Sequence, residues 1–132
     1  MVFLDSSVLI DYLQGIDHVV DFVDEQPRLL TSSLCLYEVL EGEVLSHGET
    51  DVIAARQAIG RVRAIDFNET LALEAARIQD RLASDGAPMP VYDLLIVASA
   101  RSTGDTLAVS DSDFETDRLA EVIDVRRLDE QV

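Results

Sequence analysis

Short, continuous apolar runs alternate along the chain with longer segments in which apolar residues recur every three or four positions. Val2 to Leu4 and Thr106 to Val109 are short and uninterrupted, which is typical of buried strands. The segment after Asn68 differs, because its apolar residues fall on one face of a helix. These residues are Leu71, Ala75, Ile78 and Leu82.

The complete pattern predicts strands that alternate with helices. Strands are predicted at residues 2–4, 28–31, 62–66, 106–109 and near 122–125. Helices are predicted at residues 17–25, 50–59 and 92–102, and after three caps: Ser6 or Ser7, Ser32 or Ser33, and Asn68. This alternation predicts an α/β fold over residues 1–132, with a mainly parallel central sheet of about four to five short strands flanked by helices.

Four acidic residues are attached to apolar runs in different parts of the chain. Asp5 closes the first run, Glu38 lies within an apolar helix, Asp93 opens another, and Asp111 follows a strand. Burying a carboxylate is costly unless a partner compensates its charge. In open parallel sheets, ligands gather at the carboxyl ends of the strands. If the four acids meet there, a hard divalent cation with oxygen ligands would relieve their repulsion.

Each acid also has an ordinary explanation. Asp5 could cap a helix, Asp93 could be a first-turn helix acid, and Glu38 could pair with an arginine. Asp111 and Asp113 could form an acidic turn. The residues alone leave these alternatives open beside the shared metal site.

Charge and composition narrow the possible functions. The chain has 132 residues and a net charge of −16, and all ten basic residues are arginine. Such a surface repels itself at low ionic strength, which favours a halophilic source, here predicted as a halophilic archaeon; the alternative is an acidic surface that mimics or excludes nucleic acid. The absence of lysine disfavours receiver domains, haloacid-dehalogenase-like phosphatases and P-loop NTPases.

Other absences point to a cytoplasmic protein. The single cysteine, Cys35, excludes an intramolecular disulfide and a cysteine-rich zinc site, and it lies on an apolar helix face as a core residue would. No apolar stretch approaches the roughly 20 residues of a membrane span, and no basic segment precedes the first run. A serine nucleophile has no support, because His18 and His47 belong to no motif and are predicted at the surface.

The segments that carry the four acids read VFLDSSVLID (2–11), SLCLYEVLEG (33–42), PVYDLLIVASA (90–100) and LAVSDSDF (107–114). In this order and spacing they resemble the PIN-domain ribonucleases, specifically the VapC toxins of toxin–antitoxin pairs. The resemblance covers nearly the whole chain. One position departs from the family pattern, since many relatives carry threonine or serine where Val109 stands; the neighbouring Ser110 could supply that hydroxyl.

By that resemblance, Asp5, Glu38, Asp93 and Asp111 correspond to acids that bind Mg²⁺ or Mn²⁺ and support RNA phosphodiester cleavage. Asp5 and Asp93 are predicted as direct ligands, whereas Glu38 would bind a second metal or orient the attacking water. Asp113 is a reserve ligand, because on an extended segment it would face the same way as Asp111.

The resemblance also implies partners. It implies a VapB-type antitoxin that inserts a segment over the acidic cleft, a homodimer, and an RNA substrate left open between tRNA, rRNA and mRNA. The side chains of Ile10, Tyr12 and Leu13 would either supply part of these interfaces or pack in the core. Arg101 and Arg118 would either contact RNA phosphates or pair with surface carboxylates. The alternative function is a PIN-like metal-binding module that acts mainly through protein–protein contact.

Overall fold

A computed structural model describes residues 1–48, 51–110 and 121–128, apart from the side chain of His47. The strands are β1 (Val2–Leu4), β2 (Leu29–Ser32), β3 (Val62–Ile65), β4 (Thr106–Val109) and β5 (Val125–Arg127). The helices are α1 (Ser6–Leu13), α2 (Asp17–Glu25), α3 (Ser33–His47), α4 (Val52–Gln57), α5 (Glu69–Ser84) and α6 (Val91–Thr103).

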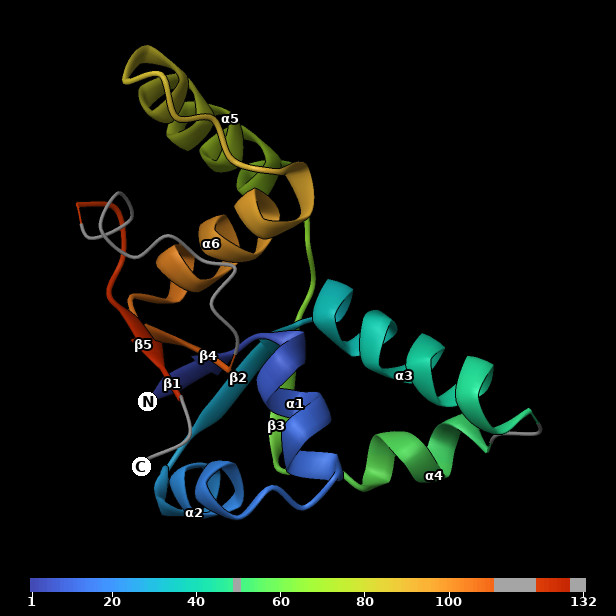
Figure 1. The fold of residues 1–132 in the computed structure, drawn as a ribbon. Coiled ribbons are helices and arrows are strands. Elements are labelled where there is room, and N and C mark those ends of the chain that lie inside the picture. Colours follow the sequence, from blue (N-terminus) through green and yellow to red (C-terminus); the bar gives the residue numbers. More distant parts are fainter. Residues whose placement is uncertain (49–50, 111–120, 129–132) are drawn as a thin grey trace.

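The five strands form one parallel sheet in the order β3-β2-β1-β4-β5 (Figure 1). β1 lies at its centre, with Phe3 beside Leu30 of β2 on one side and beside Leu107 of β4 on the other. The chain therefore builds the sheet outward from β1 in one direction and then in the other. The carboxyl ends of β1 and β4 flank this topological switch, where open α/β sheets bind their ligands.

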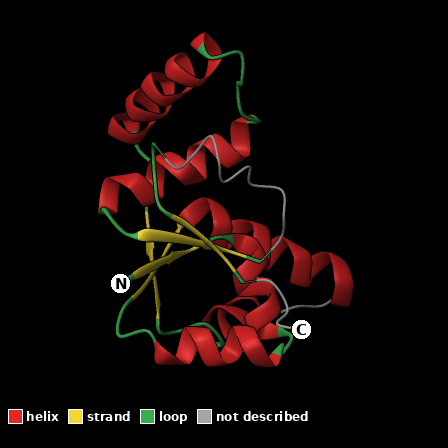
Figure 2. Cartoon of the chain, turned by 60° about the vertical axis from the view of Figure 1, so that its left-hand side comes forward, coloured by secondary structure: helices red, strands yellow, loops and turns green. Residues whose placement is uncertain are grey.

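Helices cover both faces of the sheet (Figure 2). On one face α1 packs against α2 and α3 and contacts β4, while α4 extends the same layer from α3. On the other face α5 and α6 pack together, and α6 contacts β2 and β4. The α/β class and the parallel sheet flanked by helices are thus confirmed.

Strands β1 and β4 and the inner faces of the helices form the hydrophobic core. Phe3, Leu4 and Leu107 are fully buried, and Cys35 is buried as expected. The four apolar residues predicted for one face of α5 are all buried as well. None of the helices in the described ranges combines the length and the apolar character needed to cross a bilayer.

The structure corrects two local predictions. The last strand is Val125–Arg127 rather than residues 122–125, because Ile123 packs into the core ahead of the strand that pairs with β4. The first helix is capped by Asp5 and not by Ser6 or Ser7. The other elements differ from prediction only at their ends, as for α4, which is shorter than residues 50–59.

Candidate active site

Asp5 is the centre of the candidate site. It follows the last residue of β1, and its backbone N–H donates to the Ala108 carbonyl at 3.2 Å, which continues the contact between β1 and β4. Its side chain accepts hydrogen bonds from the Val8 backbone N–H at 3.2 Å and from the Ser7 hydroxyl. Asp5 is therefore both the N-cap of α1 and a carboxylate only 5% exposed at the switch point.

Short hydrogen bonds tie the surrounding backbone to this position. The Ser110 N–H donates to the Ser7 hydroxyl oxygen at 3.0 Å, so Ser7 links Asp5 to the residue that follows β4. On the other side, the Thr31 hydroxyl donates to the Leu4 carbonyl at 2.7 Å. Both neighbours of β1 are thus held to it directly beside Asp5.

The hydroxyl of Ser110 has no hydrogen-bond partner among the described residues although it is buried. It lies one position after Val109, where the resemblance placed a departure from the family pattern. Its hydroxyl can therefore hydrogen-bond to a ligand at the carboxyl end of β4.

Helix α3 brings Glu38 to the site. Ser32 ends β2 and caps α3 by accepting from the Leu34 N–H at 3.1 Å, so the helix starts at the carboxyl edge of the sheet. Cys35 is buried on the first turn, where burial raises the pKa of its thiol to about 11 and the charge of Asp5 adds to the rise. Glu38, one turn later, is exposed.

Helix α6 supplies a tyrosine that lies between these groups. Burial and a hydrogen bond with Glu38 raise the pKa of the Tyr92 hydroxyl, and the same side chain hydrogen-bonds with Cys35. Asp93, the next residue, is half-buried on the first turn of α6, where the helix dipole stabilises a negative charge. The contacts of Tyr92 therefore join the first turns of α3 and α6, and the sequence reasoning did not identify this residue.

Asp5, Glu38 and Asp93 lie at or near the N-terminal ends of α1, α3 and α6, and the described acids form no closed cluster. In the described ranges, no three His, Cys, Asp or Glu side chains lie close enough together to hold a metal ion. Asp111 and Asp113, predicted as the fourth corner, lie outside those ranges. The described donors are carboxylate oxygens, which fit Mg²⁺ or Mn²⁺, and Mg²⁺ keeps several waters that bridge to more distant acids.

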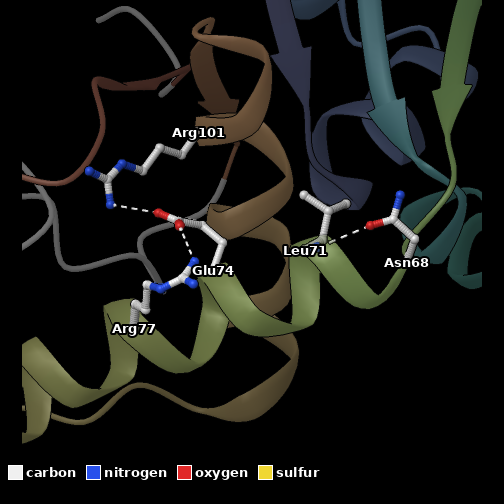
Figure 3. A network of polar contacts seen from close by, with 5 residues as sticks. All are labelled: Asn68, Leu71, Glu74, Arg77 and Arg101. Atoms are coloured by element: carbon white, nitrogen blue, oxygen red, sulfur yellow. Dashed lines mark hydrogen bonds and ion pairs between the residues drawn. The ribbon is translucent and has the colours of Figure 1, made fainter.

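One of the two arginines predicted nearest to the site is paired with a carboxylate of α5. Arg101 contacts Glu74 at 3.1 Å, and Arg77 contacts the other oxygen of the same carboxylate at 3.4 Å (Figure 3). Of the two roles considered for Arg101, the structure shows the pairing with a carboxylate. Arg118 lies outside the described residues.

Of the two histidines, His18 is half-buried rather than a free surface residue. Its Nε2 lies 2.9 Å from the Leu128 carbonyl oxygen. The side chain of His47 lies outside what the structure describes.

Residues 2–119 match the family model described as PIN domain. The chain belongs to the PIN domain family. The matched range contains all four predicted acids and the four residues between β4 and Phe114, among which are Asp111 and Asp113. The fold predicted from the resemblance is therefore confirmed at the level of the family.

Solved structures from toxin–antitoxin systems share this fold. VapBC2 from Rickettsia felis, bound to a promoter DNA fragment, has a TM-score of 0.79 at 16% identity, covering 96% of this chain and 98% of that chain. VapBC-5 from Mycobacterium tuberculosis gives 0.67 at 25% identity, covering 97% of each. VapC20 from the same organism is a sarcin-ricin loop cleaving toxin. It has a TM-score of 0.67 at 20% identity, covering 89% of this chain and 95% of that chain. No curated protein matches the chain.

Proposed function

We propose that this PIN domain is a metal-dependent endoribonuclease that hydrolyses RNA phosphodiester bonds. The observation that carries the proposal is Asp5, a carboxylate that is 5% exposed at the carboxyl end of the central strand. Glu38 lies on α3 and Asp93 on α6, and the hydrogen bond between Tyr92 and Glu38 connects these two helices. The RNA-cleaving activity named for VapC20 supports the choice of reaction.

Asp5 and Asp93 would hold Mg²⁺ or Mn²⁺ directly, with Asp111 and Asp113 as further ligands. Bound there, a divalent cation would neutralise charge on the phosphoryl oxygens and lower the pKa of a water nucleophile. Glu38 would orient the attacking water or accept its proton, because it is exposed and Tyr92 holds its carboxylate. The hydrogen bonds from Val8 and Ser7 would keep Asp5 in one rotamer throughout.

We also propose that the enzyme is the VapC-type toxin of a pair, is inhibited by a VapB-type antitoxin, and forms a homodimer in the cytoplasm. The VapBC assemblies among its structural neighbours support a protein partner. Ile10, Tyr12 and Leu13 pack against the hydrophobic core, which favours their core role over an interface.

Exposed apolar side chains on α3 and α4 fit a partner surface better. Leu45 is 77% exposed and Ile53 is 66% exposed, on two helices that contact each other. Tyr37, Val44 and Val52 on the same helices are also exposed. Contiguous exposed apolar patches mark sites of interaction with other proteins, whereas single exposed apolar side chains are ordinary.

The acidic surface is best explained by adaptation to high salt. The net charge of −16 would be screened there, which removes the self-repulsion of the folded chain.

The second candidate function is a metal-binding module that acts through protein contact with little cleavage. It is favoured by the absence of a closed three-acid cluster in the described ranges. Incubating the full chain with total RNA in Mg²⁺, Mn²⁺ or chelator separates the two functions. Cleavage that requires the metal and disappears in Asp5→Asn supports the nuclease, whereas a stable, metal-independent RNA pattern together with intact partner binding supports the module.

A further inference from the structure

Three of the ten arginines line one pocket at the free edge of the sheet. The pocket has a volume of about 260 Å³ and lies beside the starts of β2 and β3. Its walls are Pro27, Arg28, Leu29, Leu30, Arg61 and Arg63. Positive charge is therefore concentrated at one place in a chain whose net charge is −16.

Strand pairing brings these arginines together from distant parts of the sequence. The parallel register places Leu29 beside Val62 and Leu30 beside Arg63. Arg28 and Arg61 each precede one of the first paired residues, so they lie side by side at the start of the two strands. Because β3 is the edge strand, the side chain of Arg63 is exposed.

Among the described residues, only one of the three guanidinium groups has a polar partner. Arg61 donates to the Gln26 carbonyl at 2.7 Å and lies 3.9 Å from Asp24. Within the described ranges, the side chains of Arg28 and Arg63 have neither a hydrogen bond nor an ion pair. Each guanidinium offers a planar fork of donors that matches a phosphate.

Arg63 also belongs to a second pocket, which continues along the edge strand. This pocket has a volume of about 500 Å³ and reaches the start of α5. Its other walls are Ala64, Ile65, Asp66, Asn68, Thr70, Leu71 and Ser102. Because they share Arg63, the two pockets are neighbours along β3; together they are here called the β3 groove, which is basic at its outer end and neutral or acidic at its inner end.

The β3 groove lies on the strand two positions away from β1 in the sheet. In the sheet register, Arg63 lies level with Leu30 and Phe3, two residues before Asp5. Two strand spacings across the sheet and two residues along it correspond to roughly 12 Å between the Cα atoms of Arg63 and Asp5. An RNA strand cleaved at Asp5 can therefore extend into the groove.

We propose that the β3 groove binds phosphates of the RNA strand that flank the scissile bond, with Arg28 and Arg63 as the contacting groups. The proposal rests on the nuclease function proposed above. A groove that follows the backbone with positive charge is the usual means of holding single-stranded nucleic acid. Arginine is suited to it, because its fork gives paired hydrogen bonds to phosphate oxygens.

Binding of RNA without cleavage tests the groove. The full chain is titrated in chelator against a fluorescein-labelled oligouridylate of about 12 nucleotides, and the anisotropy gives Kd across a range of KCl. Losing two contacts in Arg28→Gln/Arg63→Gln should flatten the log–log salt slope by about 1.4 and weaken binding about 25-fold near 0.1 M salt. Near 1 M salt the variant and the wild type should converge.

Arg77→Gln/Arg81→Gln is the matched control. It removes the same charge from α5, at positions about 9 and 15 Å further along the helix axis than Leu71. It should bind RNA nearly as the wild type does. Arg28→Lys/Arg63→Lys should keep the salt slope while losing part of the affinity, because lysine keeps the charge without the fork.

An RNA affinity of Arg28→Gln/Arg63→Gln equal to that of the control would overturn the proposal. That result is expected if the arginines only protect the edge strand from pairing, or if the groove takes an acidic protein segment instead of RNA. Arginine-dependent binding without any cleavage in Mg²⁺ would keep the groove and reject the nuclease. RNA cleavage in Mg²⁺ together with RNA binding that does not depend on Arg28 and Arg63 would keep the nuclease and reject the groove.

Discussion

Asp5→Asn removes the charge of the buried carboxylate but leaves an oxygen that can still accept from Val8 and Ser7. Asparagine is as good an N-cap as aspartate, so the free energy of unfolding in chelator should change by less than about 0.5 kcal/mol. Asp5→Ala loses the cap and the Ser7 bond, each worth about 1 kcal/mol. The resulting loss of about 2 kcal/mol corresponds to a fall in Tm of roughly 8 °C.

Metal binding should group the same variants differently. In chelator the stability of Asp5→Asn should match that of the wild type, but in Mg²⁺ its stability should change as little as that of Asp5→Ala. At a free Mg²⁺ concentration ten times Kd, binding to the folded state alone stabilises it by about 1.4 kcal/mol. The wild type should show this gain, whereas Asp5→Asn and Asp5→Ala should not. KCl held near 1 M keeps the Debye length at roughly 3 Å, so that Mg²⁺ acts as a ligand and adds little screening.

Asp51 provides the matched control, because it caps α4 in the same way, accepting from the Ala54 N–H at 3.1 Å, and is exposed. Asp51→Ala should lose about 1 kcal/mol of stability, while Asp51→Ala and Asp51→Asn should both keep the Mg²⁺ gain and RNA cleavage. Thermal unfolding by circular dichroism and cleavage of total RNA are the two measurements. The assignment of Asp5 as a metal ligand would be refuted if Asp5→Asn still cleaved RNA. It would also be refuted if Mg²⁺ stabilised Asp5→Asn as much as it stabilises the wild type.

Three further results are expected. Tyr92→Phe deletes the hydroxyl that holds Glu38 and should lower kcat about 10-fold at unchanged Tm; an unchanged kcat contradicts this role. With its pKa at about 11, Cys35 is only about 0.1% thiolate at pH 8. The Cys35 thiol should therefore react slowly with a disulfide reagent at pH 8, and its reaction rate should rise as the pH approaches 11. If the folded protein reacted at pH 8 as fast as the denatured protein, the raised pKa would be contradicted. Finally, Tm should rise between about 0.1 and 2 M KCl as repulsion is screened, and a flat or falling Tm would argue against salt adaptation.

The predicted elements that the structure confirms are those in which side-chain pattern and packing agree. The buried face of α5 could be predicted from the sequence because its apolar residues all pack in the core: Leu71, Ala75, Ile78 and Leu82. The last strand was misplaced for the opposite reason. β5 pairs through its backbone at the edge of the sheet, so Arg126 and Arg127 remain exposed and give no apolar signal. Ile123, which did give that signal, is buried ahead of the strand.

The cap of α1 shows a limit of local sequence rules. Asp5, Ser6 and Ser7 are all good capping residues, and propensity does not choose among them. The choice is made by a distant contact, because the Asp5 N–H bonds to Ala108 and keeps Asp5 in extended backbone at the end of β1. Helix α1 can then start only at Ser6.

The site itself was predictable only in part, for a related reason. Asp5, Glu38 and Asp93 could be identified because each is an acidic residue within or beside an apolar run. Such a position is unusual, since burying a charge is costly. Tyr92 could not be identified in this way, because a tyrosine in a first helical turn is unremarkable until α3 and α6 meet. Arg28 and Arg63 are likewise ordinary until β2 and β3 pair in register.

The two kinds of charge occupy different ends of the same sheet, and the topology explains why both can be retained. All five strands are parallel, so their carboxyl ends and the helix N-termini that follow them share one edge. The N-terminus of α1 stabilises the negative charge of Asp5 at that edge without requiring a basic side chain. Arg28 precedes β2 and Arg63 is the second residue of β3, so both lie toward the opposite ends of their strands. They therefore attract phosphates without neutralising the carboxylates that a divalent cation needs.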